Sequence, residues 1–278
     1  MLTQQAVLIA QISDLHIKAG GKLSYRKVDT SGALRKAIDR LNSLCPRPDT
    51  VVITGDLVDF GNEEEYRTLK EALETLAIPY WLMVGNHDDR QAVRNVFSDR
   101  SELFQHQEFI QWEGECGPLR LLALDSTVPG KPQGELCAER LNWLNEKLEE
   151  QPLRATLVML HHPPFISGIE HMDRQRLQNP QQLAAVLAQH PQVERVLCGH
   201  IHRSMQAAFA GTIACSAPGV SHQVAFDLSP DGPAHFCLEP AGFLLHRWTP
   251  GQGILTHQCV IEQFDGPYPF YDENGLID

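Results

Sequence analysis

Near its start the chain reads Ala6-Val7-Leu8-Ile9-Ala10-Gln11-Ile12-Ser13-Asp14-Leu15-His16, an apolar run that ends directly in a carboxylate and an imidazole. The run has the length and composition of a buried strand. The same combination recurs four times: residues 51–54 precede Gly55-Asp56, residues 81–84 precede Gly85-Asn86-His87-Asp88-Asp89, residues 156–160 precede His161-His162-Pro163-Pro164, and residues 195–198 precede Gly199-His200-Ile201-His202. A lone Asp or His after a strand is most often a cap or a turn residue, but five clusters after five strands predict one shared site.

Helical patterns separate most of these strands. Apolar residues repeat at spacings of three and four within residues 34–44, 66–76, 141–148 and 183–187, as on the buried face of an amphipathic helix. Ser31 is the expected N-cap of the first helix. Alternating strands and helices predict an α/β architecture, in which ligands bind at the carboxyl ends of the strands.

The composition is that of an ordinary globular protein. With 278 residues, 42% of them hydrophobic, the chain is long enough for one large domain with a small appendage. Its formal net charge of -12 opposes sequence-independent binding to nucleic acid, so no nucleic-acid partner is expected. The seven cysteines form no CxxC pair, so neither a zinc ribbon nor a disulfide framework is indicated.

The first residues show no targeting signal. Residues 1–5 contain no Lys or Arg, and the apolar run at residues 6–10 breaks at Gln11. This run is too short for the apolar part of a signal peptide or for a membrane-spanning helix. We therefore expect a cytoplasmic protein that does not bind membranes.

The five clusters are rich in ligands for metal ions. Side chains two residues apart at a strand end, such as Asp14 and His16, lie on the same side of the pleat and can reach one ion or straddle two. Asp56 is the expected shared carboxylate, and Asn86 offers a neutral carbonyl oxygen. Imidazoles and carboxylates without a thiolate suit two divalent or trivalent ions of Fe, Mn, Co or Zn. Two divalent ions, two carboxylates and one hydroxide leave a local charge of about +1, which attracts a phosphodiester anion.

The motifs resemble, in kind and order, those of the calcineurin-like metallophosphoesterases: DxH at Asp14, GD at Asp56, GNHD at Asn86, HHPP at His161 and GHxH at His200. The HHPP motif, residues 218–224 and the terminal Tyr271-Asp272-Glu273-Asn274 are similar to bacterial class III cyclic nucleotide phosphodiesterases and glycerophosphodiesterases. The resemblance implies a four-layer α/β/β/α sandwich. It also implies one ion held by Asp14, His16, Asp56 and His202, and a second ion held by Asp56, Asn86, His161 and His200.

The resemblance further implies which residues carry out hydrolysis. A hydroxide that bridges the ions would attack phosphorus in line, while His87 donates a proton to the leaving alkoxide. Asp88 is either placed to orient His87 or is a turn residue. Asn86 and His87 are expected to contact the substrate, as is His222, whose segment resembles the substrate-facing stretch of glycerophosphodiesterases. His162 is expected to support the ligands or to pack beside them.

The character of the sequence changes after His202. Glycines and prolines become frequent, helical periodicity fades, and strand-like pieces dominate. We therefore expect a catalytic domain at residues 1–203, a β-rich cap at residues 204–258 and a C-terminal segment at residues 259–278 that returns to the catalytic domain. The β-rich region resembles the part that mediates dimerisation in this family, so a homo-oligomer, a dimer or larger, is expected.

Three functions fit the motifs. The first is a metal-dependent phosphodiesterase for small diesters, either 3',5'-cyclic nucleotides such as cyclic AMP or glycerophosphodiesters. A phosphomonoesterase or a nuclease could use the same site, because the motifs fix how hydroxide is delivered but not the shape of the substrate. The third is a non-catalytic module that binds a metal or a phosphoryl group. The presence of every ligand and of His87 argues against this third function.

Overall fold

The structure, a computed structural model, describes residues 6–277. The expectation that the chain begins without a targeting signal rests on residues 1–5, which lie outside the described residues. Within residues 6–277, no helix combines the length and the apolar character that crossing a bilayer requires.

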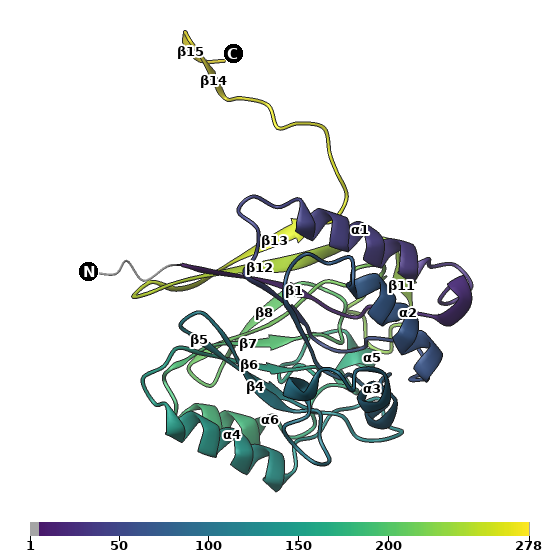
Figure 1. The fold of residues 1–278 in the computed structure, drawn as a ribbon, viewed down its shortest axis with the longest axis vertical. Helices are drawn as coiled ribbons and strands as arrows, with labels where there is room; N and C mark the ends of the chain where they lie inside the picture. The colour runs from purple at the N-terminus through teal and green to yellow at the C-terminus, as the bar shows by residue number, and fades with distance from the viewer. Residues whose placement is uncertain (1–5, 278) are drawn as a thin grey trace.

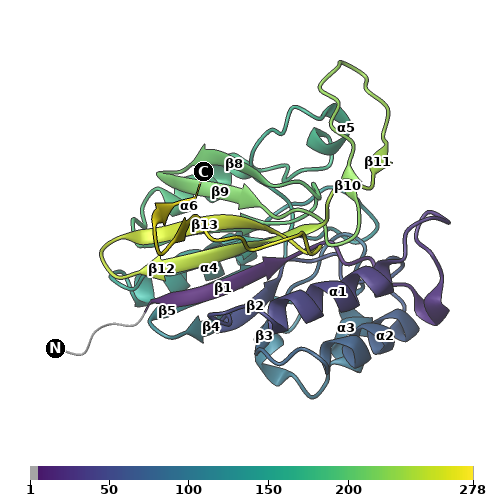
Figure 2. The same cartoon turned by 90° about the horizontal axis from the view of Figure 1, so that it is seen from above.

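One of the two large sheets has five strands in the order β13-β12-β1-β2-β3. Strand β1 pairs in parallel with β2 on one side and antiparallel with β12 on the other. Strand β1, at the start of the described chain, therefore lies between β2, the next strand in the sequence, and β12, which lies near the C-terminus (Figures 1 and 2). The bounds are β1 Val7–Ile12, β2 Thr50–Ile53, β3 Tyr80–Leu82, β12 Gly242–Thr249 and β13 Gly253–Val260.

The second large sheet has six strands in the order β4-β5-β6-β7-β9-β8. Its four central strands run parallel, and the two edge strands, β4 and β8, run antiparallel to their neighbours. The bounds are β4 Trp112–Cys116, β5 Leu119–Leu124, β6 Thr156–Leu160, β7 Val193–Cys198, β8 Met205–Phe209 and β9 Thr212–Ser216.

Helices cover the outer face of each sheet, which gives the four layers that the resemblance implied (Figure 1). The helices on the five-stranded sheet are α1 Thr30–Asn42, α2 Glu63–Leu73 and α3 Arg90–Val96. Those on the six-stranded sheet are α4 Ala138–Glu150 and α6 Pro180–Leu187. Three shorter helices lie in loops, namely η1 Ala19–Gly21, η2 Ser101–Leu103 and α5 Glu170–Asp173.

Alternate residues of the six-stranded sheet face two different cores. Leu121, Leu157 and Met159 pack into the core shared with the five-stranded sheet. Their neighbours Leu122 and Val158 pack into the separate core formed with α4 and α6. Because both faces of these strands are buried, their sequences are continuous apolar runs, which is why they could be recognised as strands.

The start of α1 differs from the prediction by two residues. Asp29, not Ser31, is the N-cap, and its side chain accepts a hydrogen bond from the backbone N–H of Gly32. Both residue types cap helices well, so the sequence alone does not separate them.

The region expected to be a separate β-rich cap at residues 204–258 is mostly part of the two sheets. Strands β8 and β9 complete the six-stranded sheet, while β12 and β13 extend the five-stranded sheet. Phe243 and Leu244 of β12 are fully buried, and this burial holds the strand against β1. What stands outside the sheets is residues 217–241, which carry the short hairpin of β10 Gln223–Val224 and β11 Phe236–Cys237.

The C-terminal segment at residues 259–278 was expected to return to the catalytic domain, but its described part extends away from the body after β13 (Figure 1). Ile261 is the last buried residue, and residues 262–277 are almost entirely exposed. This segment ends in a small hairpin of β14 Tyr271–Asp272 and β15 Gly275–Leu276.

Candidate metal centre

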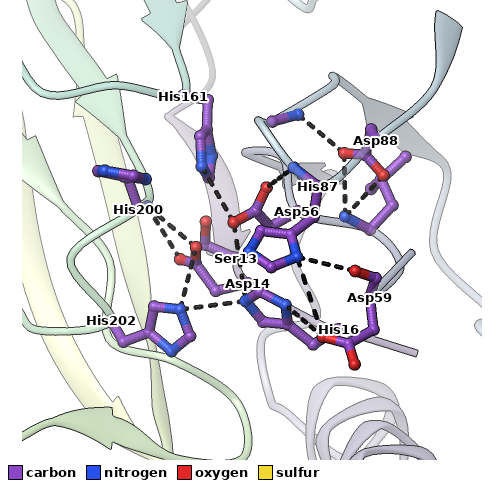
Figure 3. A network of polar contacts seen from close by, with 12 residues as sticks. Ser13, Asp14, His16, Asp56, Asp59, His87, Asp88, His161, His200 and His202 are labelled. Atoms are coloured by element: carbon purple, nitrogen blue, oxygen red, sulfur yellow. Dashed lines mark hydrogen bonds and ion pairs between the residues drawn. The ribbon is translucent and has the colours of Figure 1, made fainter. Parts of the chain in front are cut away.

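The five predicted clusters meet at one place between the two sheets (Figure 3). The loops after β1, β2 and β3 bring Asp14, His16, Asp56, Asn86 and His87, and the loops after β6 and β7 bring His161, His200 and His202. Most of these side chains are buried, and His87 is the most exposed of the imidazoles. The site thus depends on both sheets being correctly packed.

Most of the predicted ligands have a strained backbone. The φ angles of Asp14, His16, Asp56, His200 and His202 lie between 46° and 72°, in the left-handed region. Such a conformation costs about 1–3 kcal/mol for a residue with a side chain and concentrates at functional sites. The prediction that Asp14 and His16 share one side of a strand pleat is therefore corrected, because left-handed loop residues, not the strand itself, turn both side chains inward.

One group of donors comprises Asp14, His16 and His202, whose ligand atoms lie within 4.8 Å of one another. The Nε2 atoms of His16 and His202 are 3.1 Å apart, and His202 Nε2 is 3.5 Å from Asp14 Oδ1. His16 Nε2 is also 3.7 Å from Asp56 Oδ2, so Asp56 borders this group. This is the set predicted for the first ion.

The second predicted ion has a different signature, which is a set of buried donors without partners. Asn86 Oδ1, His161 Nε2 and His200 Nε2 are all buried and none has a hydrogen-bond partner. Leaving a buried polar atom unpaired costs about 1–3 kcal/mol. A metal ion would supply the missing partner for these three atoms. Asp56 Oδ2 lies 3.3 Å from His161 Nε2 and could bind the same ion. The residues present therefore fit the predicted pair of ions.

Backbone carbonyls orient the imidazoles. The Nδ1 atoms of His161, His202 and His87 lie 2.8–3.1 Å from the carbonyl oxygens of Thr54, His222 and Asp59. A carbonyl can only accept, so each Nδ1 carries the hydrogen. Each Nε2 is then the free nitrogen, and those of His161 and His202 are turned toward the donor groups.

The pKa values favour neutral imidazoles at two ligands. Burial, reinforced by the neighbouring His162, places the pKa of His200 well below its usual value. Burial and the nearby His16 lower the pKa of His202 to about 3. A neutral imidazole keeps the lone pair that a metal requires, so these side chains are ready to bind an ion at neutral pH.

Asp56 stays ionised although it is buried. Burial works to raise the pKa of its carboxyl, but the imidazoles of His161 and His87 hold that pKa well below the usual range. Its Oδ1 also accepts a hydrogen bond from the backbone N–H of His87, at 2.9 Å. Asp56 thus remains a carboxylate between the two donor groups, as expected for a shared ligand.

Asp59 also belongs to the site, although it was not predicted from the sequence. Its carboxylate lies 2.6 Å from Lys18 Nζ and 3.5 Å from His16 Nδ1, while its carbonyl accepts from His87. Burial opposes ionisation, but His16 and Lys18 lower the pKa of Asp59 to about 2. The available signal was its position three residues after Asp56, on the loop that carries that ligand.

Asp88 does not orient His87, which corrects one of the two predicted roles for this residue. Its carboxylate accepts hydrogen bonds from the backbone N–H groups of Leu57, Val58 and Gly85 and from the hydroxyl of Tyr66. Burial raises its pKa to about 6. Asp88 therefore ties the loop after β2 to the loop after β3, and it acts on the site through the backbone.

His222 reaches the site from the segment outside the sheets. Its ring packs against those of His202 and Tyr25, with centroid distances of 4.5 and 5.4 Å, and its carbonyl orients His202. Burial, with the nearby His202, lowers its pKa to about 2, so the ring is neutral. Contact with substrate stays a prediction for this residue.

His162 lies beside the ligands with both ring nitrogens engaged. Nδ1 is 2.8 Å from Ser126 Oγ and Nε2 is 3.1 Å from the carbonyl oxygen of Pro132. Its ring packs against His200 at a centroid distance of 4.8 Å. These contacts agree with a supporting role and leave no nitrogen free for an ion.

A cavity of about 390 Å³ opens over the donor groups. This volume lies in the range of small-molecule sites. Its inner wall is formed by His16, Asp56, Asn86, His87, His200 and His202. Its outer wall is formed by Tyr25, by α5 and the residues after it, and by the β10–β11 hairpin. Tyr25 packs against Phe236 of that hairpin with ring centroids 5.0 Å apart, a contact that no sequence signal indicated.

Two facing donor groups that share a carboxylate, with an additional histidine at the cavity, define the class of binuclear metallohydrolases. Within that class, the chain belongs to the calcineurin-like phosphoesterase family. The sequence model of this family matches residues 7–204.

Relatives with similar sequences span nearly the whole chain. A protein of Arcobacter nitrofigilis with the name "Probable glycerophosphodiester phosphodiesterase" is 42% identical over 98% of this chain and 100% of its own length. A 3',5'-cyclic-nucleotide phosphodiesterase of Nostoc is 31% identical over 90% of this chain and 87% of its own. Among solved structures, a dimetal phosphatase from Danio rerio has the same fold, with a TM-score of 0.65 over 92% of this chain and 99% of its own at 14% identity.

Proposed function

We propose that this phosphoesterase hydrolyses small phosphodiesters, namely glycerophosphodiesters or 3',5'-cyclic nucleotides. The observation that carries the proposal is a set of three buried atoms without hydrogen-bond partners, from Asn86, His161 and His200. The carboxylate of Asp56 lies 3.3 Å from the His161 atom and also borders the first donor group. The names of the Arcobacter and Nostoc relatives support the two classes of diester.

Asp14, His16, Asp56 and His202 would hold one ion, and Asp56, Asn86, His161 and His200 the other. The donors are nitrogen and oxygen atoms, which suits Fe, Mn, Co or Zn and disfavours a soft ion. When bound, such a pair supplies Lewis acidity and lowers the pKa of water at the site.

His87 is the group that we assign to the leaving alcohol. Its Nδ1 donates to the Asp59 carbonyl, so Nε2 is the nitrogen left for the substrate. Its side chain is 34% exposed at the cavity, whereas the assigned metal-ligand histidines are nearly fully buried. As the P–O bond to the leaving alcohol breaks, the oxygen of a water bonds to phosphorus and that water loses a proton. The departing oxygen takes a proton from Nε2 of the His87 ring in its protonated form, in which both ring nitrogens carry a hydrogen.

The outer wall supports a small, uncharged substituent on the phosphate. Tyr25 and Phe236 offer aromatic faces, and Gln175 and His171 offer polar groups without a fixed charge. Burial also lowers the pKa of His171. The chain's net charge of -12 disfavours a nucleic-acid substrate. A cytoplasmic location fits the seven cysteines, all of which are free thiols, because disulfides are rare in that compartment.

The test uses bis(p-nitrophenyl) phosphate with protein loaded with Mn²⁺, Zn²⁺, Co²⁺ or Fe²⁺ in turn. We expect turnover that requires metal, and a fall in kcat of roughly 10²–10⁴ in His87→Ala, because this change removes the proton donor. His106→Ala is the matched control, since His106 pairs with Glu139 away from the cavity. A wild-type rate no higher than that of His87→Ala would refute the proposal.

A substrate panel then separates the two classes of diester and the phosphomonoesterase alternative. Glycerophosphoglycerol, whose two substituents are uncharged, cyclic AMP and p-nitrophenyl phosphate are compared by kcat/KM with the same loaded protein. We expect at least one of the diesters to exceed the monoester. A higher value for the monoester would favour the alternative.

A further inference from the structure

A buried glutamine lies on the strand that leads to the metal centre. Gln11 is in β1, the middle strand of the five-stranded sheet, three residues before Asp14. Its side chain is fully buried, and no step of the proposed hydrolysis uses it. A primary amide has two N–H donors and one oxygen acceptor, and burying these groups without partners is costly. The partners of Gln11 therefore show what this residue does.

The amide nitrogen of Gln11 donates to both sheets. Nε2 is 3.0 Å from Thr54 Oγ1, directly after β2, and 2.8 Å from the carbonyl oxygen of Cys198, the last residue of β7. A carbonyl can only accept, so this contact fixes which end of the amide faces the six-stranded sheet. One side chain thus connects the ends of two strands that belong to different sheets.

Both strand ends lead to ligands assigned to the second ion. The carbonyl of Thr54 accepts from Nδ1 of His161 at 2.8 Å. Cys198 lies two residues before His200. The backbone between them is closely packed, because a Cβ on Gly199 would lie 2.8 Å from the Thr54 carbonyl oxygen and 3.0 Å from His161 Nδ1. A shift of either strand end would therefore displace an imidazole of the site.

The hydrogen bonds continue from Gln11 to the edge strand β13. His246 of β12 is buried, with Nε2 3.1 Å from Gln11 Oε1 and Nδ1 2.9 Å from Thr256 Oγ1. The amide oxygen can only accept, so Nε2 of His246 carries the hydrogen. Burial and the nearby Arg195 lower the pKa of His246 to about 3, so its ring is neutral. Nδ1 must then accept from the hydroxyl of Thr256.

All of these hydrogen bonds run in one direction. Arg195 Nη1 donates to Thr256 at 3.3 Å, and from there each residue donates to the next as far as the Cys198 carbonyl. Hydrogen bonds in series polarise one another in a low-dielectric interior, and the series begins at a nearly buried positive charge. The four residues that make up the series, called the Gln11 network below, are Arg195, Thr256, His246 and Gln11.

We propose that the Gln11 network positions the imidazoles of His161 and His200 for the second metal ion. Gln11 is the positioning residue, because its amide fixes the strand end that orients His161 and the strand end that precedes His200. The rest of the network holds that amide in its donating orientation. Strands β12 and β13, which follow the last ligand in the sequence, thereby contribute to the metal centre. The inference rests on the assignment of His161 and His200 as ligands, but not on which phosphoester is hydrolysed.

Gln11→Met tests the proposal, since methionine is similar in length but forms none of the three hydrogen bonds. Binding of one of the two ions is expected to weaken roughly tenfold in a calorimetric titration with Co²⁺, because the support of its ligands is lost. The absorption bands of the Co²⁺-loaded protein are expected to shift, since they depend on coordination geometry. Both measurements report on the ligands without requiring turnover.

Gln111→Met is the matched control for Gln11→Met. Gln111 is also a fully buried glutamine, but neither its amide nitrogen nor its amide oxygen has a hydrogen-bond partner. Its replacement is expected to leave the Co²⁺ affinity and the absorption bands unchanged. The comparison separates the loss of the Gln11 hydrogen bonds from the general effect of an apolar side chain in the interior.

Thr256→Val tests the far end of the network, where the side chain is only half-buried. Valine keeps the shape of threonine but cannot donate to His246, so Co²⁺ binding is expected to weaken by a smaller factor than in Gln11→Met. Thr256→Ser keeps the hydroxyl and is expected to restore the wild-type affinity. Far-UV circular dichroism establishes that each variant is folded.

A folded Gln11→Met protein with the affinity and absorption bands of wild type would overturn the proposal. Equal losses in Gln11→Met and Gln111→Met would overturn it as well. If Gln11→Met does not fold, Thr256→Val decides, and wild-type affinity in that variant overturns the proposal. Wild-type protein that binds no Co²⁺ would instead refute the metal centre itself, so the two failures are distinguishable.

Discussion

Asp56 and Asp59 lie three residues apart on one loop, yet they have different tasks. Asp56 presents its carboxylate to both donor groups, whereas Asp59 supports His16 through its carboxylate and His87 through its carbonyl. One loop therefore sets the position of a shared ligand, of a further ligand and of the proton donor. Its two acidic side chains can be changed independently, which allows these tasks to be separated by mutation.

Asp59→Asn is expected to weaken the binding of one metal ion by roughly 10–100-fold, because His16 loses the negative charge that supports it. The Asp59 carbonyl remains, so His87 keeps its orientation, and kcat at saturating metal is expected to fall much less than in His87→Ala. Metal titration by calorimetry and kcat at saturating metal provide the two measurements.

Asp39→Asn, an exposed change on α1, is the control for the Asp59 variant. Equal losses of kcat in Asp59→Asn and His87→Ala at saturating metal would contradict the division of tasks between carboxylate and carbonyl.

At the level of secondary structure, a buried ion pair joins α3 to the end of β5. Arg90, the first residue of α3, lies 2.7 Å from Asp125 Oδ2, and Asp125 also accepts from the backbone of Ile110 and Thr127. Burial opposes the charge of Asp125, but Arg90 keeps its pKa below the usual value. The pair thus connects a helix that covers the five-stranded sheet to the end of a strand in the six-stranded sheet.

Asp125→Ala is expected to lower the free energy of unfolding at pH 7 by about 3–5 kcal/mol, because it leaves Arg90 without its partner. The pKa of Asp125 is lower in the folded than in the unfolded protein. Its contribution is therefore present above the unfolded pKa and is lost as the pH falls through the folded pKa. Urea titrations at pH 7 and at low pH measure the difference from wild type, which is expected to shrink in acid.

Asp99→Ala provides the comparison for Asp125→Ala, because Asp99 pairs with Lys70 at the surface. Its cost is expected to stay below about 1 kcal/mol. A similar cost for both variants would show that burial of the Arg90–Asp125 pair contributes little.

The elements that could be predicted from the sequence are those with a distinctive pattern of residue types. The strands before Asp14, Asp56 and His161 are apolar on both faces, and their ends carry ligands, so both strand and site could be recognised. Strand β12 was missed because the charged and polar residues Arg247 and His246 interrupt its apolar pattern. The destination of residues 204–258 could not be predicted either, since sheet pairing over more than 200 residues leaves no local signal.

The same distinction holds within the site. The ligands were predicted because their residue types and order are specific, whereas the support of His87 by the Asp59 carbonyl was not, since any residue has a carbonyl. Asp88 was given a role from proximity in sequence, but its side chain turns toward the backbone of the β2 loop. The contact of Tyr25 with Phe236 joins segments more than 200 residues apart and depends on tertiary packing alone.

In the whole molecule, the metal centre connects the two sheets. Three of its loops follow strands of the five-stranded sheet, and two follow strands of the six-stranded sheet. Ions that bind both sets of ligands stabilise the packing of one sheet on the other, because they bind the folded state only.

Removal of the ions by chelation is expected to lower Tm. At a free metal concentration about 100 times the dissociation constant, bound metal contributes about 2.7 kcal/mol, which corresponds to roughly 5–10 °C for a domain of this size. Differential scanning fluorimetry with chelator and with added Mn²⁺ measures the shift. His200→Ala is expected to respond less to added metal, and an equal response would contradict the assignment of His200 as a ligand.

The pairing of β1 with β12 determines when the active site can be completed as the chain is synthesised. Strand β1 and four of the seven ligands leave the ribosome early, but the outer partner of β1 follows only with residues 242–249. Synthesis of the intervening residues takes roughly 10–40 s at typical translation rates. Throughout that interval one edge of β1 lacks its strand partner. The ligands His161, His200 and His202 are synthesised in turn during the same interval. Metal can therefore be captured in its final coordination only by a nearly finished chain.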